Sequence, residues 1–155
     1  FGVVYPVLLA AHVIMLSRLP HGPVLTISFL GAAALYDVGA FATGIAFGKH
    51  PMSPRLSPKK TWEGAAGATL LVVLLALTVG PHLGPLTVGS ALALAGVTIV
   101  LAPLGDLAES MLKRDLDIKD MGSVLPGHGG VMDRIDGMLL VAPAAFWLIY
   151  FVVGH

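Results

Sequence analysis

The residues best suited to chemistry are concentrated between positions 106 and 136 of this 155-residue chain. This stretch holds seven of the nine acidic residues and four of the nine basic residues, in a sequence that is otherwise mostly Leu, Ala, Val and Gly. If its first part is helical, spacings of three, four and seven residues bring four polar side chains onto one face, with a fifth beside them. These residues are Asp106, Glu109, Ser110, Lys113 and Arg114. The face would offer carboxylates to a cation and ammonium groups to an anion.

The second part of the stretch has the composition of a glycine-rich turn. Pro126 blocks helix propagation, and the glycines around it permit close approach of the backbone to a ligand. Such a turn, with polar residues before it, suits a phosphate group. The candidate substrate-binding residues here are Lys119, Asp120, His128, Gly129 and Gly130.

Carboxylates flank this turn on both sides. Asp133 and Arg134 follow it at the start of a final apolar run, and Asp106 precedes it. If the chain brings Asp106 and Asp133 together, their oxygens would hold a hard divalent cation, which usually arrives with substrate phosphates. We therefore expect these two aspartates to be metal ligands.

Most of this stretch resembles the signature of the phosphatidate cytidylyltransferase family, also called CDP-diacylglycerol synthases. The match spans 27 residues, from Ser110 to Asp136, and is far more specific than a short glycine motif. It includes Ser110, Leu112, Lys113, Arg114, Lys119, Asp120, Gly122, Leu125, Pro126, His128, Gly129, Gly130, Asp133, Arg134, Ile135 and Asp136.

A second polar segment covers residues 48–64. Its residues 57–64 are similar to another stretch typical of the same family, as are Asp37, Gly39, Ala40 and Phe41 ahead of it. Within the segment, Ser57 could cap a helix starting near Pro58, whose free N–H groups would attract an anion. Lys59 and Lys60 add positive charge there, so a triphosphate or a lipid phosphate would be held well. The alternative is that these lysines only contact lipid headgroups.

Composition indicates an integral membrane protein. Hydrophobic residues make up 56% of the chain and charged residues 12%, against about 25% in soluble domains, and the mean hydropathy is +0.88. A helix needs ~20 residues to cross a bilayer, and we expect an all-α, polytopic transmembrane bundle with about five spans. The expected spans are residues 1–17, 24–47, 64–79, 87–104 and 135–153. They form a single membrane-embedded domain over residues 1–155, expected to be the C-terminal portion of a longer protein.

The basic residues predict the orientation of this bundle. The two charged loops, residues 48–63 and 106–134, carry eight of the nine lysines and arginines, and Arg18 lies on the opposite side. By the positive-inside rule we expect both loops to be cytoplasmic. The expected location is the cell inner or plasma membrane. The zero net charge excludes an electrostatic footprint for nucleic acid, and the absence of cysteine excludes a disulfide framework.

The resemblance implies an enzyme that transfers the cytidylyl group of CTP to phosphatidate, giving CDP-diacylglycerol and pyrophosphate. In that reaction Mg²⁺ on Asp106 and Asp133, alone or with a second cation, would clamp the phosphates. The catalytic cations would be Lys113 and Arg114. The substrate-binding residues would be Ser57, Lys59, Lys60, Ser110, Lys119, Asp120, His128, Gly129, Gly130 and Arg134.

Two other functions stay open. A related enzyme could use CTP with another lipid phosphate or a polyprenyl phosphate, which the sequence does not distinguish. A cation-binding transporter could use Asp37, an ionisable residue inside a span, although transporter sites tend to lie near the membrane midplane. Membrane lipids are expected partners, and the oligomeric state, including a homodimer, stays open.

Overall fold

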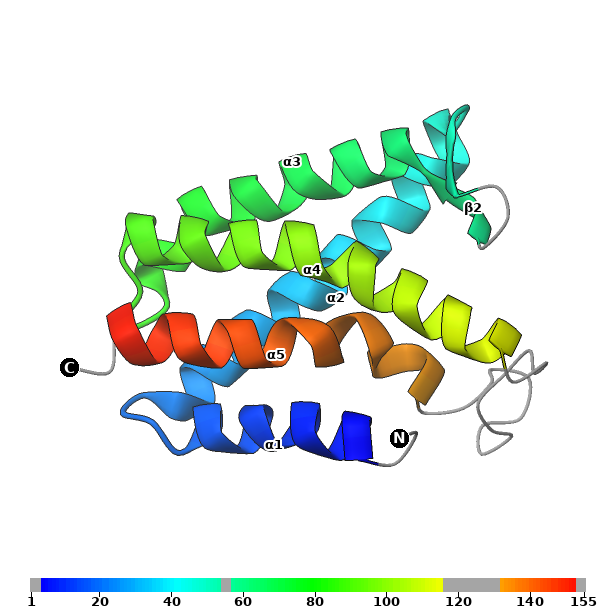
Figure 1. The fold of residues 1–155 in the computed structure, drawn as a ribbon. Coiled ribbons are helices and arrows are strands. Elements are labelled where there is room, and N and C mark those ends of the chain that lie inside the picture. Colours follow the sequence, from blue (N-terminus) through cyan, green and yellow to red (C-terminus); the bar gives the residue numbers. More distant parts are fainter. Residues whose placement is uncertain (1–3, 54–56, 116–131, 153–155) are drawn as a thin grey trace.

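The computed structural model describes residues 4–53, 57–115 and 132–152, which form a helical bundle with a small β-hairpin at one end (Figure 1). The helices are α1 (Val4–Ser17), α2 (Gly22–Phe47), α3 (Trp62–Thr78), α4 (Val88–Asp115) and α5 (Met132–Val152). Strands β1 (Pro51–Ser53) and β2 (Ser57–Thr61) form the antiparallel hairpin, and a 3-10 turn, η1 (Gly80–His82), follows α3. The helical membrane bundle predicted from composition is confirmed, with the hairpin as a small addition to it.

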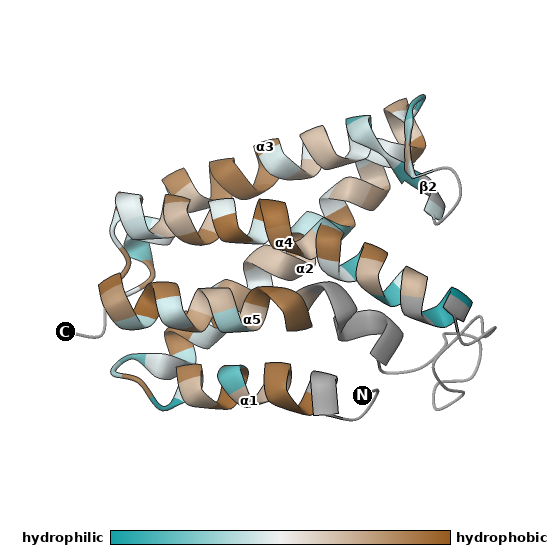
Figure 2. Cartoon of the chain, in the orientation of Figure 1, coloured by the Kyte–Doolittle hydropathy of each residue, from teal (hydrophilic) through white to brown (hydrophobic). Residues whose placement is uncertain are grey.

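The helices are apolar around most of their circumference (Figure 2). Large side chains such as Phe41, Ile45 and Leu70 are 62–72% exposed, a surface that suits lipid better than water. Within the described residues, three segments are long and apolar enough to cross a membrane: Gly22–Phe47, Trp62–His82 and Val88–Met111. The described parts of α1 and α5 give shorter apolar segments, Val7–Ser17 and Met138–Val152. The count of five spans therefore stays a prediction.

Small residues let α2 and α3, which pack extensively together, approach closely. A Cβ atom on Gly64 would lie 2.7 Å from the Ala40 carbonyl oxygen, and one on Gly67 would lie 2.3 Å from Thr43 Cγ2. The Thr43 hydroxyl donates to the Gly39 carbonyl at 2.6 Å and lies 3.1 Å from the Gly64 carbonyl oxygen. This contact fixes the polar N-terminal end of α3 against α2.

The prediction of a helix starting near Pro58 is wrong. Residues 57–61 form β2, in which Ser57 pairs with Ser53, and α3 begins at Trp62. The N-cap is Thr61, an extended β-branched residue whose hydroxyl accepts the Gly64 N–H at 3.2 Å. Proline is compatible with a short edge strand because such a strand leaves N–H groups unpaired. The helix N-terminus is thus four residues later than expected.

The first part of the second charged segment is helical, which is the condition under which its polar residues were expected to share one face. The span expected to end at residue 104 continues as α4 through Pro103 to Asp115, so the first ten residues of the predicted loop are helical. Most residues from 106 to 114 are good helix formers, which offsets the hydrogen bond lost at the proline. The hydrophilic residues of the hairpin and of the last turns of α4 lie at the same end of the bundle (Figure 2). Arg18 follows α1 at the opposite end, as predicted (Figure 1).

Candidate active site

Helices α2, α3 and α4 and the hairpin line an open cavity of about 440 Å³ at the hydrophilic end of the bundle. Its polar lining comes mainly from α4 and β2, and its apolar lining mainly from α2, α3 and β1. The polar side chains are Tyr36, Asp37, Ser57, Lys60, Thr61, Asp106, Glu109, Ser110 and Lys113. The apolar residues are Ala40, Phe41, Met52, Ala65 and Pro103. The cavity therefore combines charged side chains with apolar ones.

The charged wall is one face of α4. The four residues that share the predicted helical spacing, Asp106, Glu109, Ser110 and Lys113, all line the cavity. The Ser110 hydroxyl donates to the Asp106 carbonyl at 2.8 Å, one turn earlier in the helix. Arg114 is exposed on α4 and does not belong to the cavity lining that the described residues define.

The hairpin supplies a cation to this face. Lys60 Nζ on β2 forms an ion pair with Asp106 Oδ2 on α4. The two side chains are 30% and 20% exposed, so the pair is only partly shielded from solvent. Because β2 leads directly into α3, the lysine is carried by a rigid junction rather than by a free loop. The pair joins the two polar segments that the sequence singled out.

A second ion pair lies deeper in the same wall. Lys113 Nζ is 3.3 Å from Glu109 Oε2, four residues earlier on α4, and the Glu109 side chain is 9% exposed. Glu109 was predicted on this face without a role, whereas Tyr36, which is buried and lines the cavity, was not predicted. The signal for Glu109 was its helical spacing from Asp106. Tyr36 had no signal beyond its position next to Asp37.

Several predicted site residues fall where the structure gives no side chain. Lys59 lies on β2, and Asp133 and Arg134 lie in the first turn of α5, with side chains outside the described part of the structure. The remaining predicted contacts lie outside the described residues altogether. These are Lys119, Asp120, His128, Gly129 and Gly130. Their roles stay predictions.

The donor set of the cavity fits a hard cation in its chemistry. Asp37, Asp106 and Glu109 line it, and carboxylate oxygens are the ligands that Mg²⁺ prefers. Among the side chains that the structure describes, no three acidic or histidine residues gather closely enough to hold a metal ion. Mg²⁺ is usually held by one or two carboxylates together with substrate phosphates, and the second ligand predicted beside Asp106 is Asp133, whose side chain is outside the described part of the structure.

The similarity of this chain to known proteins shows its family. The family model described as "Cytidylyltransferase family" matches residues 1–152. The chain belongs to the cytidylyltransferase family. It is 52% identical over 121 residues to a phosphatidate cytidylyltransferase of Mycobacterium bovis, a match that covers 73% of this chain and 37% of that protein. It is also 44% identical over 133 residues to the phosphatidate cytidylyltransferase of Helicobacter pylori, covering 84% of this chain and 49% of that protein.

A third relative is the phosphatidate cytidylyltransferase of Thermotoga maritima, 40% identical over 126 residues, which are 77% of this chain and 47% of that protein. The cytidylyltransferase chain thus spans between about a third and a half of the length of these relatives. The family resemblance inferred from the charged stretch and the hairpin sequence is confirmed.

Proposed function

We propose that this chain carries the active site of an enzyme that transfers the cytidylyl group of CTP to phosphatidate. The products are CDP-diacylglycerol, an intermediate of phospholipid synthesis, and pyrophosphate. The relatives named above are phosphatidate cytidylyltransferases, which supports both substrates.

The observation that carries the proposal is the composition of the cavity walls. Lys60 and Lys113 could neutralise a nucleotide phosphate, Asp106 could bind its counter-cation, and apolar residues such as Phe41 line the same cavity. Helices α2 and α3, which contribute much of the apolar lining, expose large hydrophobic residues to the exterior. A soluble triphosphate and a membrane lipid could therefore reach one place from two directions.

The reaction requires no covalent nucleophile on the protein. A phosphate oxygen of phosphatidate, already anionic, attacks the α-phosphorus of CTP. The bond from that phosphorus to the oxygen bridging it to the β-phosphorus breaks, and pyrophosphate leaves with the electron pair. Two anions must approach and charge builds on the leaving group, so the barrier falls when fixed cations surround the phosphates. Lys60 and Lys113 are the described side chains placed to do this.

Asp106 and Asp133 would hold Mg²⁺, with a second cation left open. When bound, the ion supplies positive charge that clamps and neutralises the phosphates. Lys60, which pairs with Asp106, would lie beside this site, where its ammonium group could contact a phosphate oxygen. Ser110 would hold the Asp106 turn of α4 through its hydrogen bond to the Asp106 carbonyl.

The charged end of the bundle would face the cytoplasm, where CTP is present, because it collects the basic residues. The apolar helix surfaces would contact membrane lipids. A different acceptor, such as a polyprenyl phosphate, would need the same charged wall and a different apolar wall.

The test is an acceptor series with CTP labelled at the α-phosphate. Purified protein in lipid nanodiscs with Mg²⁺ receives phosphatidate, a polyprenyl phosphate or diacylglycerol, which lacks the phosphate nucleophile. We expect labelled lipid and equimolar pyrophosphate with phosphatidate and none with diacylglycerol. If only the polyprenyl phosphate is labelled, the acceptor is a polyprenyl phosphate and not phosphatidate. If folded protein labels no acceptor, the proposal is overturned. Cation uptake into liposomes without nucleotide would favour the transporter alternative.

A further inference from the structure

Glu63, in the first turn of α3, binds a segment that lies well before it in the sequence. Its Oε2 atom accepts the backbone N–H groups of Lys49 at 3.1 Å and His50 at 3.2 Å. Its Oε1 atom lies 2.5 Å from His50 Nδ1. Next to this contact, the Trp62 N–H donates to the His50 carbonyl at 3.0 Å. One carboxylate therefore ties the connection between α2 and β1 to the start of α3.

This contact is different from a helix cap. The N-cap hydrogen bond of α3 comes from the Thr61 hydroxyl to the Gly64 N–H, and a capping box would place a Glu three residues after the cap, where Gly64 stands. Glu63 stands one position earlier and is directed to another segment. A carboxylate in the first helical turn is favourable in any case, but that effect does not require Lys49 or His50.

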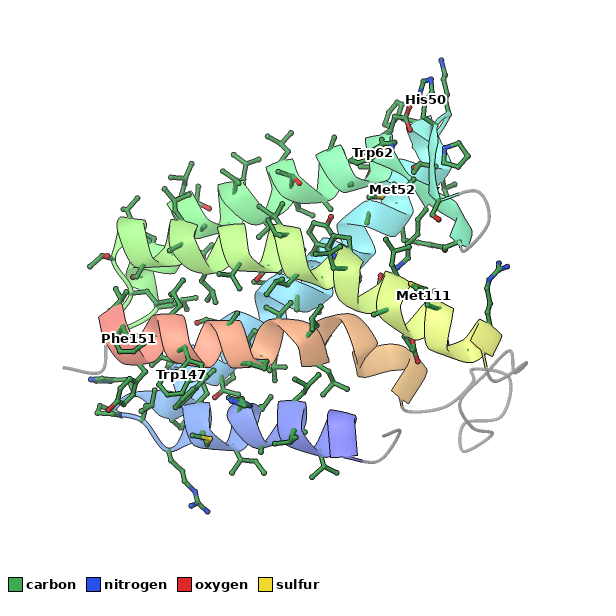
Figure 3. The ribbon with its side chains drawn as sticks, in the orientation of Figure 1. His50, Met52, Trp62, Met111, Trp147 and Phe151 are labelled. Carbon is green, nitrogen blue, oxygen red and sulfur yellow. The ribbon has the colours of Figure 1, made fainter. Side chains whose placement is uncertain are left out.

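The contact lies close to the lysine of the cavity. Lys60 precedes Glu63 by three residues, and β2 joins α3 without a linker. We call the contacts of Glu63 with Lys49 and His50 the Glu63 clamp. Pro51 directly follows these two residues and pairs with Thr61, so the two hairpin strands are held at their base by the clamp and at the Thr61 cap. Figure 3 shows His50 and Trp62 together at the hairpin end of α3, with Met111 on α4.

We propose that Glu63 is a positioning residue: by fixing the base of the hairpin, it holds Lys60 at Asp106 and so at the phosphate site. The clamp itself is independent of any substrate. Its importance for nucleotide binding rests on the proposed function. Loss of the clamp should leave the helices intact but let the hairpin, and with it Lys60, sample other positions.

The first experiment measures the hairpin directly, without nucleotide. Because this chain contains no cysteine, Pro51→Cys and Met111→Cys, both at exposed positions, can be spin-labelled in the detergent-solubilised full chain. Double electron–electron resonance then gives the distance distribution between β1 and α4. We expect one narrow distribution in the parent, a broader or shifted one in Glu63→Ala, and an intermediate one in Glu63→Gln, which keeps one acceptor oxygen.

Lys49→Ala is the matched control. It also removes one charge at the base of the hairpin, but Glu63 uses the Lys49 backbone N–H, which every residue but proline retains. The distribution in Lys49→Ala should match that of the parent. His50→Ala removes only the imidazole contact and should have a smaller effect than Glu63→Ala.

The second experiment measures cytidylyl transfer in the same variants. We expect Glu63→Ala to raise the KM for CTP about tenfold with a smaller change in kcat, because the phosphate-binding lysine is displaced while the carboxylate site is kept. Glu63→Gln should recover part of this loss. If Glu63→Ala does not fold, the Glu63→Gln and His50→Ala variants carry both tests.

The outcomes separate the two proposals. A distance distribution unchanged in Glu63→Ala overturns the positioning role, whatever happens to activity. A broadened distribution with an unchanged KM for CTP also overturns it, because the hairpin position would not matter for the site. If the parent does not transfer a cytidylyl group at all, the proposed function fails, while the distance measurement still decides whether Glu63 holds the hairpin.

Discussion

Lys60 and Asp106 are separated by 46 residues in the sequence and form an ion pair between β2 and α4. The pair connects the two polar segments of a chain that is otherwise strongly apolar, and both partners line the same cavity. A lysine ammonium and a metal ion can satisfy the same carboxylate. In the proposed function, the pair would compensate the Asp106 charge before the substrates bind, and Lys60 would lie beside the phosphate site.

Replacing Lys60 by methionine should weaken CTP binding much more than it weakens the fold. The pair is partly exposed, and such pairs contribute about 1 kcal/mol or less to stability. A charge-assisted contact to a phosphate is worth more, so we expect the KM for CTP to rise at least about tenfold. Arg18→Met removes the same charge at the opposite end of the bundle and should leave the KM unchanged. Equal effects of the two substitutions would show that only overall charge matters.

The close approach of α2 and α3 predicts a strong effect at Gly64. A Cβ atom there would meet the Ala40 carbonyl oxygen at 2.7 Å, and a backbone atom cannot move aside cheaply. We expect Gly64→Ala to destabilise the protein by about 1–3 kcal/mol, seen as a lower thermal unfolding temperature in detergent. Gly31→Ala and Gly96→Ala are matched controls, because a Cβ at either position meets nothing within 4 Å. A Gly64→Ala protein as stable as these controls would contradict the packing described.

The position of the α3 N-cap gives a test of the hairpin. Thr61→Ala removes the hydroxyl that accepts the Gly64 N–H and should cost about 1 kcal/mol of stability. Ser57→Ala should not change the thermal unfolding temperature, because Ser57 lies in β2 and caps no helix. A lower unfolding temperature in Ser57→Ala and an unchanged one in Thr61→Ala would instead support a helix that starts near Pro58, as predicted from the sequence.

The sequence correctly predicted the parts of the fold that depend on composition and on the helical spacing of side chains. Long apolar runs predicted the helices, and the spacing of Asp106, Glu109, Ser110 and Lys113 predicted their shared face, because both depend only on local geometry. The end of the α4 span was placed too early, since a proline and a glycine were given more weight than the helix-forming residues that follow. The family was predicted from the charged stretch itself and is confirmed.

The contacts between distant segments could not be predicted in the same way. Nothing local indicates that Lys60 pairs with Asp106, or that Glu63 binds the backbone at Lys49 and His50, because both depend on how the hairpin folds back. The strand at residues 57–61 was mistaken for a helix start, since Ser57 followed by Pro58 is also a common N-terminal pattern. Pairing with β1 stabilises residues 57–61 as a strand instead of a helix start.

The most direct test of cytidylyl transfer in this cavity is an assay of wild-type protein and Asp106→Asn with α-labelled CTP, phosphatidate and Mg²⁺ in nanodiscs. Asparagine keeps the shape of the side chain and removes the charge that a cation and Lys60 require. Matching thermal unfolding temperatures would establish that the variant is folded. We expect labelled CDP-diacylglycerol from the wild type, a loss of at least about 100-fold in the variant, and no transfer by the wild type without a divalent cation. Transfer by Asp106→Asn within about threefold of wild type would contradict the assignment of the reaction to this site.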